Sequence, residues 1–370
     1  MRVAINALSA FPGAAGIGRY AANVTRSVAL SAKSHEVIII TGPRSPLLAD
    51  EQMRGKATFV QVVPRGIDWE QLELPSILEE MKVDVYHCPL FTAPVVRVCK
   101  ALITLHDIIP EKLPEKTPKD FLTMWRALLK PSLRAADGIV TVSRYSKKDI
   151  VEHFELNPDQ VHVAVQAISE HFSLANARAL AETVREKHGL GERYALYVGS
   201  VEPRKNTLGL VEAFSKIAKD FPKLSLVIAG RRLFDDYDPA RKAEELGAGS
   251  QVRCLGYVED GDLPGLYGGA EVLVYPSSYE GFGLPVAEAM ACGCPVITGK
   301  GSSLPEAGGV AARYVDVSHI DKIALAMREL LEDRAMRNDM VSKGLARARR
   351  FSPRAFGNRL VRIYEQVLAA

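Results

Sequence analysis

The stretch YPSSYEGFGLPVAEAMACGCPVIT, which runs from Tyr275 to Thr298, decides how the second half of the chain folds. The apolar residues 271–275 predict a buried strand, and Gly281 and Gly283 permit backbone angles that other residues avoid. Pro285 suits the first turn of a helix, so the stretch predicts a strand, a tight loop and a helix. Free N–H groups from Gly283 onward and the positive end of the helix dipole would attract a phosphate group.

Two glutamates, Glu280 and Glu288, stand in this stretch, one in the loop and the other about one turn into the helix. Because a carboxylate repels phosphate, we expect both side chains to point past the phosphates to hydroxyl groups that can donate hydrogen bonds. A nucleotide sugar offers such hydroxyls on its ribose and on its hexose. The pair therefore favours a nucleotide-sugar site, although two glutamates at this spacing also occur by chance on the surface of ordinary βα units.

The letters EGFGLPVAEAMACGCPVI around the glutamates resemble the retaining, mannosyltransferase-like glycosyltransferases of the group-1 family, which have the GT-B fold. The resemblance implies an α/β protein with two Rossmann-like, doubly wound domains that face a cleft. It also implies that Glu280 contacts the donor sugar and that Glu288 binds the ribose hydroxyls. The loop residues that it implies for donor binding are Gly281, Phe282, Gly283 and Leu284.

Length and composition fit two domains, because 370 residues with 47% hydrophobic content can bury two cores of ordinary size. The pattern changes around residues 163–187, so we expect an acceptor domain at residues 1–172 and a donor domain at residues 173–352. The resemblance implies that a last helix, at residues 353–370, crosses back to the first domain. The formal net charge of +3, without an acidic or basic tail, gives no indication of a nucleic-acid partner.

The cysteines and the hydropathy pattern indicate a cytoplasmic protein. The five cysteines are odd in number and lack metal-ligand spacing, which favours small core residues in a reducing compartment. No uninterrupted apolar stretch approaches the roughly 18 residues of a membrane-spanning helix. Polar residues near the N-terminus weaken an interpretation as a secretion signal.

The N-terminal half predicts a parallel sheet that opens with a strand at residues 2–7 and a glycine-rich loop, GAAGIGRY. This loop lacks the GxGxxG spacing of dinucleotide-binding proteins. It resembles the GIGRY loop of one branch of the group-1 family, which implies that Gly16 and Gly18 approach the donor phosphates or the acceptor. Further strands are predicted at residues 36–40, 58–62, 83–87, 101–105 and 138–142.

Histidines stand at the ends of two of these strands, where parallel sheets bind their ligands. His106 heads the run LHDIIP, which resembles the histidine that lies beside the transferred sugar in the family. Asp107 would either position the loop or touch the acceptor. For His87 we expect a structural role, since a lone histidine at a strand end more often supports the fold.

The segment YVGSVEPRKN predicts a phosphate site in the second domain. Arg204 and Lys205 precede a helix predicted at residues 207–221, and two cations beside a helix N-terminus can neutralise a diphosphate. The letters EPRKN resemble the phosphate-binding segment of the family, although many members have an arginine where this chain has Ser200. The resemblance further implies that the backbone near Val258 meets the nucleotide base.

Two other charged segments allow alternatives. Residues 121–135, FLTMWRALLKPSLRA, carry Arg126, Lys130 and Arg134 beside large apolar residues, with a proline that would kink a helix. This segment is either a surface that lies on anionic lipid or an amphipathic helix that packs on the sheet. The letters DYD, at residues 236–238, spell the metal-binding motif of another glycosyltransferase fold, but we interpret them as a solvated loop.

These features predict an enzyme that transfers a hexose, with mannose from GDP-mannose as the best guess, to a glycan or a lipid-linked acceptor. We expect retention by same-face substitution without a metal or another cofactor, because cations and loop N–H groups can stabilise the leaving diphosphate and no nucleophile is evident. His106, Glu280, Arg204 and Lys205 would be the catalytic residues. Another GT-B enzyme, such as a nucleotide-sugar epimerase, and a non-catalytic nucleotide-binding module are the alternatives.

Overall fold

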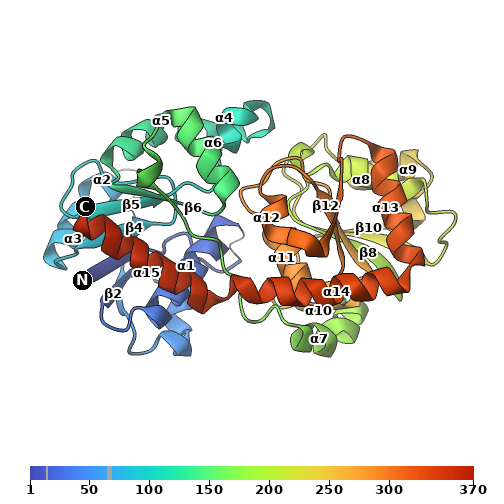
Figure 1. Ribbon diagram of the computed structural model, residues 1–370, viewed down its shortest axis with the longest axis horizontal. Coiled ribbons are helices and arrows are strands. Elements are labelled where there is room, and N and C mark those ends of the chain that lie inside the picture. Colours follow the sequence, from blue (N-terminus) through green and yellow to red (C-terminus); the bar gives the residue numbers. More distant parts are fainter. Residues whose placement is uncertain (14–15, 65–68) are drawn as a thin grey trace. The chain divides into compact units, whose positions relative to one another are not determined.

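The computed structural model describes all residues of the chain except 14–15 and 65–68. The chain forms two compact units, one made of Met1–Ala167 and Ser352–Ala370 and the other of Ile168–Phe351 (Figure 1). The boundary therefore lies five residues before the predicted one. A backbone hydrogen bond from Ile168 N to Phe351 O, 2.9 Å long, joins the first residue of the second unit to its last.

The first unit is built on a parallel sheet of seven strands in the order β3-β2-β1-β4-β5-β6-β7. Its strands are β1 (Arg2–Asn6), β2 (Glu36–Thr41), β3 (Thr58–Gln61), β4 (Val85–Cys88), β5 (Lys100–Thr104), β6 (Gly138–Thr141) and β7 (Val161–Val163). Its α-helices are α1 (Ile17–Ser31), α2 (Trp69–Leu72), α3 (Leu74–Glu80), α4 (Ile109–Lys112), α5 (Lys119–Ala135), α6 (Arg144–Phe154) and α15 (Pro353–Ala369). The predicted parallel sheet is confirmed, with strand ends that shift by one or two residues.

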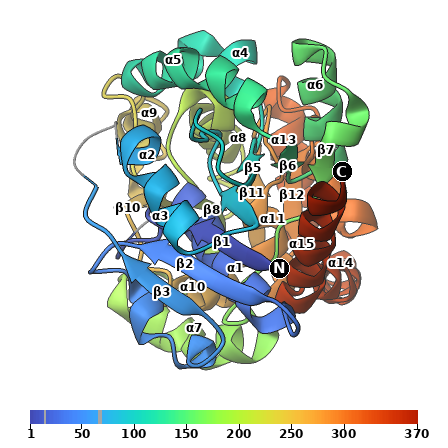
Figure 2. The ribbon, with the colours of Figure 1, turned by 90° about the vertical axis from the view of Figure 1, so that its left-hand side faces the viewer.

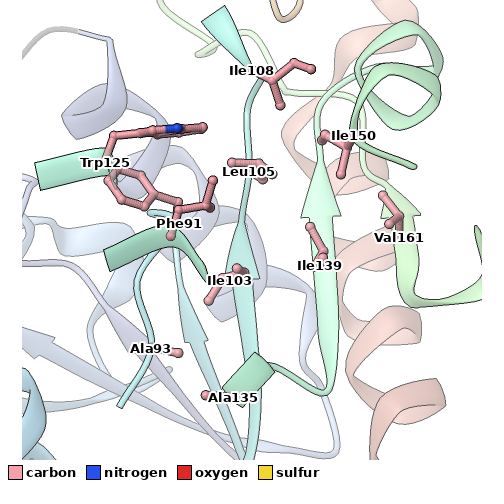
Figure 3. Close-up of a cluster of buried hydrophobic side chains, with 11 residues drawn as sticks. Phe91, Ala93, Ile103, Leu105, Ile108, Trp125, Ala135, Ile139, Ile150 and Val161 are labelled. Atoms are coloured by element: carbon pink, nitrogen blue, oxygen red, sulfur yellow. The ribbon is translucent and has the colours of Figure 1, made fainter. Parts of the chain in front are cut away.

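One face of this sheet packs on α2, α3 and α5. Ala4, Ile38 and Tyr86 lie on this face and pack with α2 and α3. Ile103 and Ile139 lie on the same face, because successive side chains of a strand alternate, and they pack with α5 in a cluster that also holds Trp125 and Phe91 (Figure 3). The ring centroids of Trp125 and Phe91 lie 4.8 Å apart.

The last helix, α15, belongs to the first unit and runs beside α1 (Figures 1 and 2). This close approach requires glycine at position 357, because a Cβ there would lie 2.0 Å from Ser27 O of α1. The return of the last helix to the first unit, which the family resemblance implied, is thereby confirmed.

The second unit has a six-stranded parallel sheet in the order β10-β9-β8-β11-β12-β13. Its strands are β8 (Arg193–Val198), β9 (Leu224–Ala229), β10 (Val252–Gly256), β11 (Val272–Tyr275), β12 (Val296–Gly299) and β13 (Ala312–Val315). Its α-helices are α7 (Leu174–Lys187), α8 (Thr207–Ser215), α9 (Pro239–Glu245), α10 (Leu263–Gly269), α11 (Leu284–Ala291), α12 (Leu304–Gly308), α13 (Ile320–Glu332) and α14 (Arg334–Ala348).

One predicted helix of the second unit is too long, because α8 ends at Ser215 and not near Phe221. The backbone N–H groups of Ile217 and Ala218 both bond to Phe214 O, so the chain turns tightly here. Pro222 follows soon after, and proline disfavours the helical conformation of the residue before it. None of the helices in the described residues is long and apolar enough to cross a membrane.

Candidate active site

The second sheet changes direction between β8 and β11, which lie next to each other although the chain visits β9 and β10 between them. Ligands of open parallel sheets bind beyond the carboxyl ends of the strands at such a switch point. The loop after β8 carries Arg204 and Lys205, and the loop after β11 carries Glu280. The topology therefore brings together three predicted site residues that are distant in sequence.

Glu280 is held by a cluster of cations and hydroxyl groups. Its Oε1 lies 2.9 Å from Arg204 Nη1 and 3.8 Å from Lys205 Nζ. The same oxygen accepts hydrogen bonds from the hydroxyls of Tyr275 and Ser277, each 2.8 Å long. Lys205 Nζ also donates to the Tyr275 hydroxyl over 3.0 Å. These contacts anchor one oxygen of the carboxylate at a defined place.

Arg204 is more deeply engaged than the sequence indicated. Its side chain is only 9% exposed and forms a second ion pair with Glu202, 2.8 Å from Nη2 to Oε1, as well as a hydrogen bond to Tyr279 O. A guanidinium shared between two carboxylates positions them. Direct contact of Arg204 with a phosphate stays a prediction, whereas its contacts in the structure hold Glu280.

The loop between Glu280 and α11 is fixed by its own sequence. Glu280 N donates to Ser302 Oγ over 2.9 Å, and Ser303 Oγ donates to Glu280 O over 2.7 Å. Gly283 has φ 99° and a Cβ there would lie 2.8 Å from the Leu304 side chain, so only glycine fits. The predicted strand, loop and helix are thus confirmed.

The remaining predicted loop residues surround the start of α11, whose N-cap is Gly283. Phe282 is buried and packs edge-on against Phe351 with centroids 5.3 Å apart, so it anchors the loop. Gly281 is buried, and Leu284 begins the helix.

Glu288 lies in α11 away from the Arg204–Glu280 cluster and is 2% exposed. The hydroxyl of Tyr267, on α10, donates to its Oε2 over 3.0 Å. The bond from Tyr267 connects Glu288 to α10, whereas the loops after β8 and β11 hold Glu280. Its role toward a ribose stays a prediction.

Val258 follows β10 at the carboxyl ends of the strands, the edge where the loops after β8 and β11 also begin, and is buried. Neighbouring strand ends are tied together here, since Gly230 N donates to Gly256 O over 2.7 Å. Contact of this backbone with a base is untested.

The predicted residues of the first unit form their own group around Tyr20. The ring of His106 stands edge-on to the ring of Tyr20, with centroids 4.4 Å apart. His106 Nε2 lies 3.3 Å from Pro89 O, and because a carbonyl only accepts, Nε2 donates and carries the proton. Burial lowers the pKa of His106 to about 4 despite the bond to Pro89. The ring is therefore neutral near pH 7, and its Nδ1 can accept a hydrogen bond.

The glycine-rich loop precedes α1, whose N-cap is Gly16, with φ 53°. Gly18 is buried in the first turn, two residues before Tyr20. The loop's two alanines, residues 14–15, lie outside the described residues. Asp107 accepts a hydrogen bond from Ile109 N over 2.9 Å, which supports the interpretation that it positions its loop.

His87 has the structural role that we expected. It lies fully buried between the hydroxyl of Tyr364, 2.7 Å from Nδ1, and Thr104 Oγ1, 2.9 Å from Nε2. Burial, with a smaller contribution from the nearby His106, lowers the pKa of His87 to about 3. The bond to Tyr364 connects the sheet to α15.

The basic-apolar segment is an amphipathic helix that packs on the sheet. Trp125 and Leu129 of α5 are buried in the core, while Arg126, Lys130 and Arg134 are exposed. The helix continues through its proline to Ala135.

Two residues of the DYD segment, Tyr237 and Asp238, stabilise the local fold. Asp238 caps α9 by accepting hydrogen bonds from Ala240 N and Arg241 N, and it forms an ion pair with Arg232. Tyr237 accepts a hydrogen bond from Leu208 N at the start of α8 over 3.2 Å.

Sequence reasoning missed the groups that hold Glu280 and Glu288 in place. These are Glu202, Tyr275, Ser277, Ser302, Ser303 and Tyr267. Tyr275 and Ser277 stand within the deciding stretch, so their closeness in sequence to Glu280 could have predicted these contacts. The sequence contains no comparable indication that Tyr267 contacts Glu288.

Comparisons with known proteins identify the family of the chain. The model of the family "Glycosyl transferases group 1" matches residues 181–347, and that of "Glycosyltransferase Family 4" matches residues 14–169. The chain is 33% identical to O-antigen chain mannosyltransferase B of Escherichia coli, over 91% of this chain and 92% of that protein. The chain is a group 1 glycosyltransferase.

Solved structures show that this glycosyltransferase has the GT-B fold. A glycosyltransferase from Rickettsia africae aligns with a TM-score of 0.75 at 17% identity, covering 99% of this chain and 98% of that one. The Anabaena protein HepE, solved with UDP and glucose, aligns with a TM-score of 0.77 at 18% identity and covers 99% of both chains. The predicted fold class and family are thus confirmed.

The buried cluster predicts how the stability of this glycosyltransferase depends on pH. Burial alone would raise the pKa of Glu280, but Arg204 and Lys205 lower it from 4.5 to about 2. Because the pKa is lower in the folded state, the stabilisation is complete above about pH 4.5 and is lost as the pH falls toward 2. The full shift corresponds to about 3 kcal/mol.

Urea unfolding at pH 5 and pH 3 would measure this effect. The wild-type protein should lose more stability between these two pH values than Glu280→Gln, which has no carboxyl group to protonate at position 280. Glu244→Gln, at an exposed position of α9, is the control and should follow the wild type. Equal losses in the wild type and Glu280→Gln would contradict the ion-paired state of Glu280.

Proposed function

We propose that this glycosyltransferase transfers mannose from GDP-mannose to a glycan or lipid-linked acceptor with retention of configuration. The observation that carries the proposal is the Arg204–Lys205–Glu280 cluster at the switch point of the second sheet. Similarity to an O-antigen chain mannosyltransferase over nine-tenths of the chain supports mannose as the sugar and a surface glycan as the product.

The cluster suits the breaking of a sugar–phosphate bond. Lys205 would stabilise the negative charge that develops on the leaving diphosphate, and the N–H groups at Gly283 and Leu284 would add to it. Glu280, anchored through Oε1, would accept a hydrogen bond from a hexose hydroxyl at Oε2 and would stabilise the positive charge that develops on the sugar in the transition state. In the first unit, Nδ1 of neutral His106 would be free of the proton and able to accept a hydrogen bond from a ligand hydroxyl.

Retention follows in this proposal from attack on the face that the diphosphate leaves. The leaving phosphate oxygen takes the proton of the acceptor hydroxyl, while the acceptor oxygen forms the new bond to the sugar carbon. Glu280, the carboxylate at the centre of the cluster, is tightly held by its hydroxyl and cationic neighbours and is a poor nucleophile.

We further propose that transfer needs no metal ion, since the charges on the diphosphate are met by side chains and N–H groups. EDTA should therefore leave the transfer rate unchanged, and Asp236→Ala should have little effect on the rate in a radiometric mannose-transfer assay. Loss of activity in EDTA that added magnesium or manganese restores would contradict this.

A peripheral contact with anionic membrane is also proposed for the exposed basic side of α5. Ala93 N donates to Ser132 Oγ over 3.2 Å, which places exposed Val95 and Val96 on the segment beside this helix. Exposed apolar side chains next to cations suit the interface of an anionic bilayer, where each basic residue contributes about 1 kcal/mol.

Vesicle flotation would test this contact. The double variant Arg126→Glu/Lys130→Glu should lose binding to vesicles that contain phosphatidylglycerol, and added salt should weaken the binding of the wild type. Lys219→Glu/Lys223→Glu, which reverses two exposed charges of the second unit, is the matched control and should still bind. Equal binding of both variants would rule out α5 as the docking surface.

A thermal-shift screen with GDP, UDP, ADP and dTDP sugars tests the proposed donor. A ligand present at one hundred times its dissociation constant adds about 2.7 kcal/mol to stability, so the true donor should stand out. GDP-mannose should give the largest shift. A larger shift with another base or sugar would identify that nucleotide sugar as the donor, and no shift with any of them would contradict the proposal that the chain binds one of these donors.

A further inference from the structure

Arg231 is an exposed cation at the carboxyl edge of the second sheet, directly after Gly230 and the end of β9. Its guanidinium lies over the ring of Tyr257, 4.5 Å from the centroid. Within the described part of the chain no carboxylate forms an ion pair with it, whereas the neighbouring Arg232 is paired with Asp238. Arg231 is therefore a positive charge that the fold itself does not neutralise.

The backbone holds Arg231 against the loop that carries Lys205. Val201 N donates to Arg231 O over 2.8 Å, and Leu233 N donates to Val201 O over 3.1 Å. The contact is tight, because a Cβ on Gly230 would lie 1.7 Å from Gly199 O. The loops after β8 and β9 thus form one surface at the edge where Lys205 and Glu280 meet.

The charges of the cluster show why a further cation is needed. Arg204 and Lys205 carry two positive charges, and Glu202 and Glu280 carry two negative ones, so the four side chains sum to zero. A diphosphate group is itself negative, and a neutral cluster gives it little net attraction. Lys205 alone would have to bind the ligand while remaining 3.8 Å from Glu280.

We infer that Arg231 supplies the second cation for the diphosphate of the nucleotide and that Tyr257 positions its guanidinium for this contact. A guanidinium stacked on a ring keeps its N–H donors in the plane of the guanidinium, pointing away from the ring's centre, where they can bind a phosphate in a forked contact. Arg231 would also compensate for Ser200, an uncharged residue on the adjoining loop at the position where many family members have an arginine. Arg204, in contrast, acts on the carboxylates.

This inference rests on the proposed nucleotide-sugar function, and calorimetric titration separates the two. GDP and inorganic pyrophosphate are titrated into the wild-type chain and into Arg231→Gln. Loss of a charge-assisted phosphate contact should lower the affinity for both ligands by the same factor, roughly ten- to a hundredfold. Arg232→Gln is the matched control, since it removes the neighbouring exposed arginine and should bind both ligands like the wild type.

Two further variants sharpen the test. Tyr257→Leu should lower the affinity for pyrophosphate several-fold, because the Arg231 guanidinium loses the ring that positions it but keeps its charge. Ser200→Arg, introduced into Arg231→Gln, should restore part of the lost affinity by placing a cation on the adjoining loop. Unchanged melting temperatures of the variants at Arg231, Tyr257 and Ser200 would exclude unfolding as the cause of weaker binding.

The outcomes are distinct. Weaker binding of GDP with unchanged binding of pyrophosphate would overturn the inference, because Arg231 would then contact the base. Wild-type affinity of Arg231→Gln for both ligands would overturn it and leave the proposed function intact. A wild-type chain that binds neither pyrophosphate nor any nucleoside diphosphate would overturn both.

Discussion

Arg204→Ala is expected to lower the free energy of unfolding by about 3–5 kcal/mol, the usual cost of removing one partner of a buried ion pair. The guanidinium is surrounded by Glu202, Glu280 and the carbonyl of Tyr279. Without it two carboxylates would lie in a buried site whose remaining cation, among the contacts described above, is Lys205. Urea unfolding of the wild type and the variant at pH 7 measures the difference.

An exposed arginine provides the control for this result. Arg328 is paired with Asp220 on the surface, and Arg328→Ala should cost no more than about 1 kcal/mol. The double variant Arg204→Met/Glu280→Gln should recover much of the stability, since it removes charges of both signs, but it should not recover transfer. A cost for Arg204→Ala as small as that for Arg328→Ala would mean that water screens the pair and that the cluster is open.

The deciding stretch shows how far sequence reasoning reaches. Its strand, loop and helix could be predicted because Gly281, Gly283 and Pro285 are local signals whose physical meaning does not depend on the rest of the chain. The end of α8 shows the opposite case. Apolar residues continue past Ser215, so the hydrophobic pattern extends the helix, while the turn that leads into β9 ends it.

The partners of Arg204 show what the sequence could not provide. Glu280 reaches it because β8 and β11 are neighbours in the sheet, and strand order is a property of the whole fold. Glu202 stands two residues away, but only the backbone of the loop decides that both side chains point the same way. The residue type therefore indicated a phosphate contact, while the fold adds two carboxylates that compete for the same charge.

His106 illustrates the same limit in the first unit. The family resemblance selected it, but its neutral state and its tautomer follow from burial and from Pro89 O, a backbone atom that no side-chain pattern reveals. The edge-on contact with Tyr20 likewise depends on the approach of α1 to the end of β5, where the Tyr20 hydroxyl lies 3.5 Å from Thr104 Oγ1. These contacts determine which ring nitrogen can accept a hydrogen bond.

Glu280→Gln is expected to lower kcat on the order of a hundredfold or more while nucleoside diphosphate affinity stays near normal. The variant keeps the shape and one oxygen acceptor for Tyr275 and Ser277, but it removes the charge next to a sugar that becomes positive as its bond to phosphate breaks. Steady-state kinetics at saturating donor measure kcat, and GDP titration measures affinity.

Glu288→Gln separates the two carboxylates, because a ribose contact hardly changes as the glycosidic bond breaks. Its loss should raise the donor KM and spare kcat. Gln can still accept the hydrogen bond from Tyr267, so the buried contact between α10 and α11 survives and a change in KM reports on the ligand. If Glu280→Gln instead lost nucleotide affinity and Glu288→Gln lost only turnover, the two roles would be reversed. The sugar would then lie over α11 and the ribose beside Arg204.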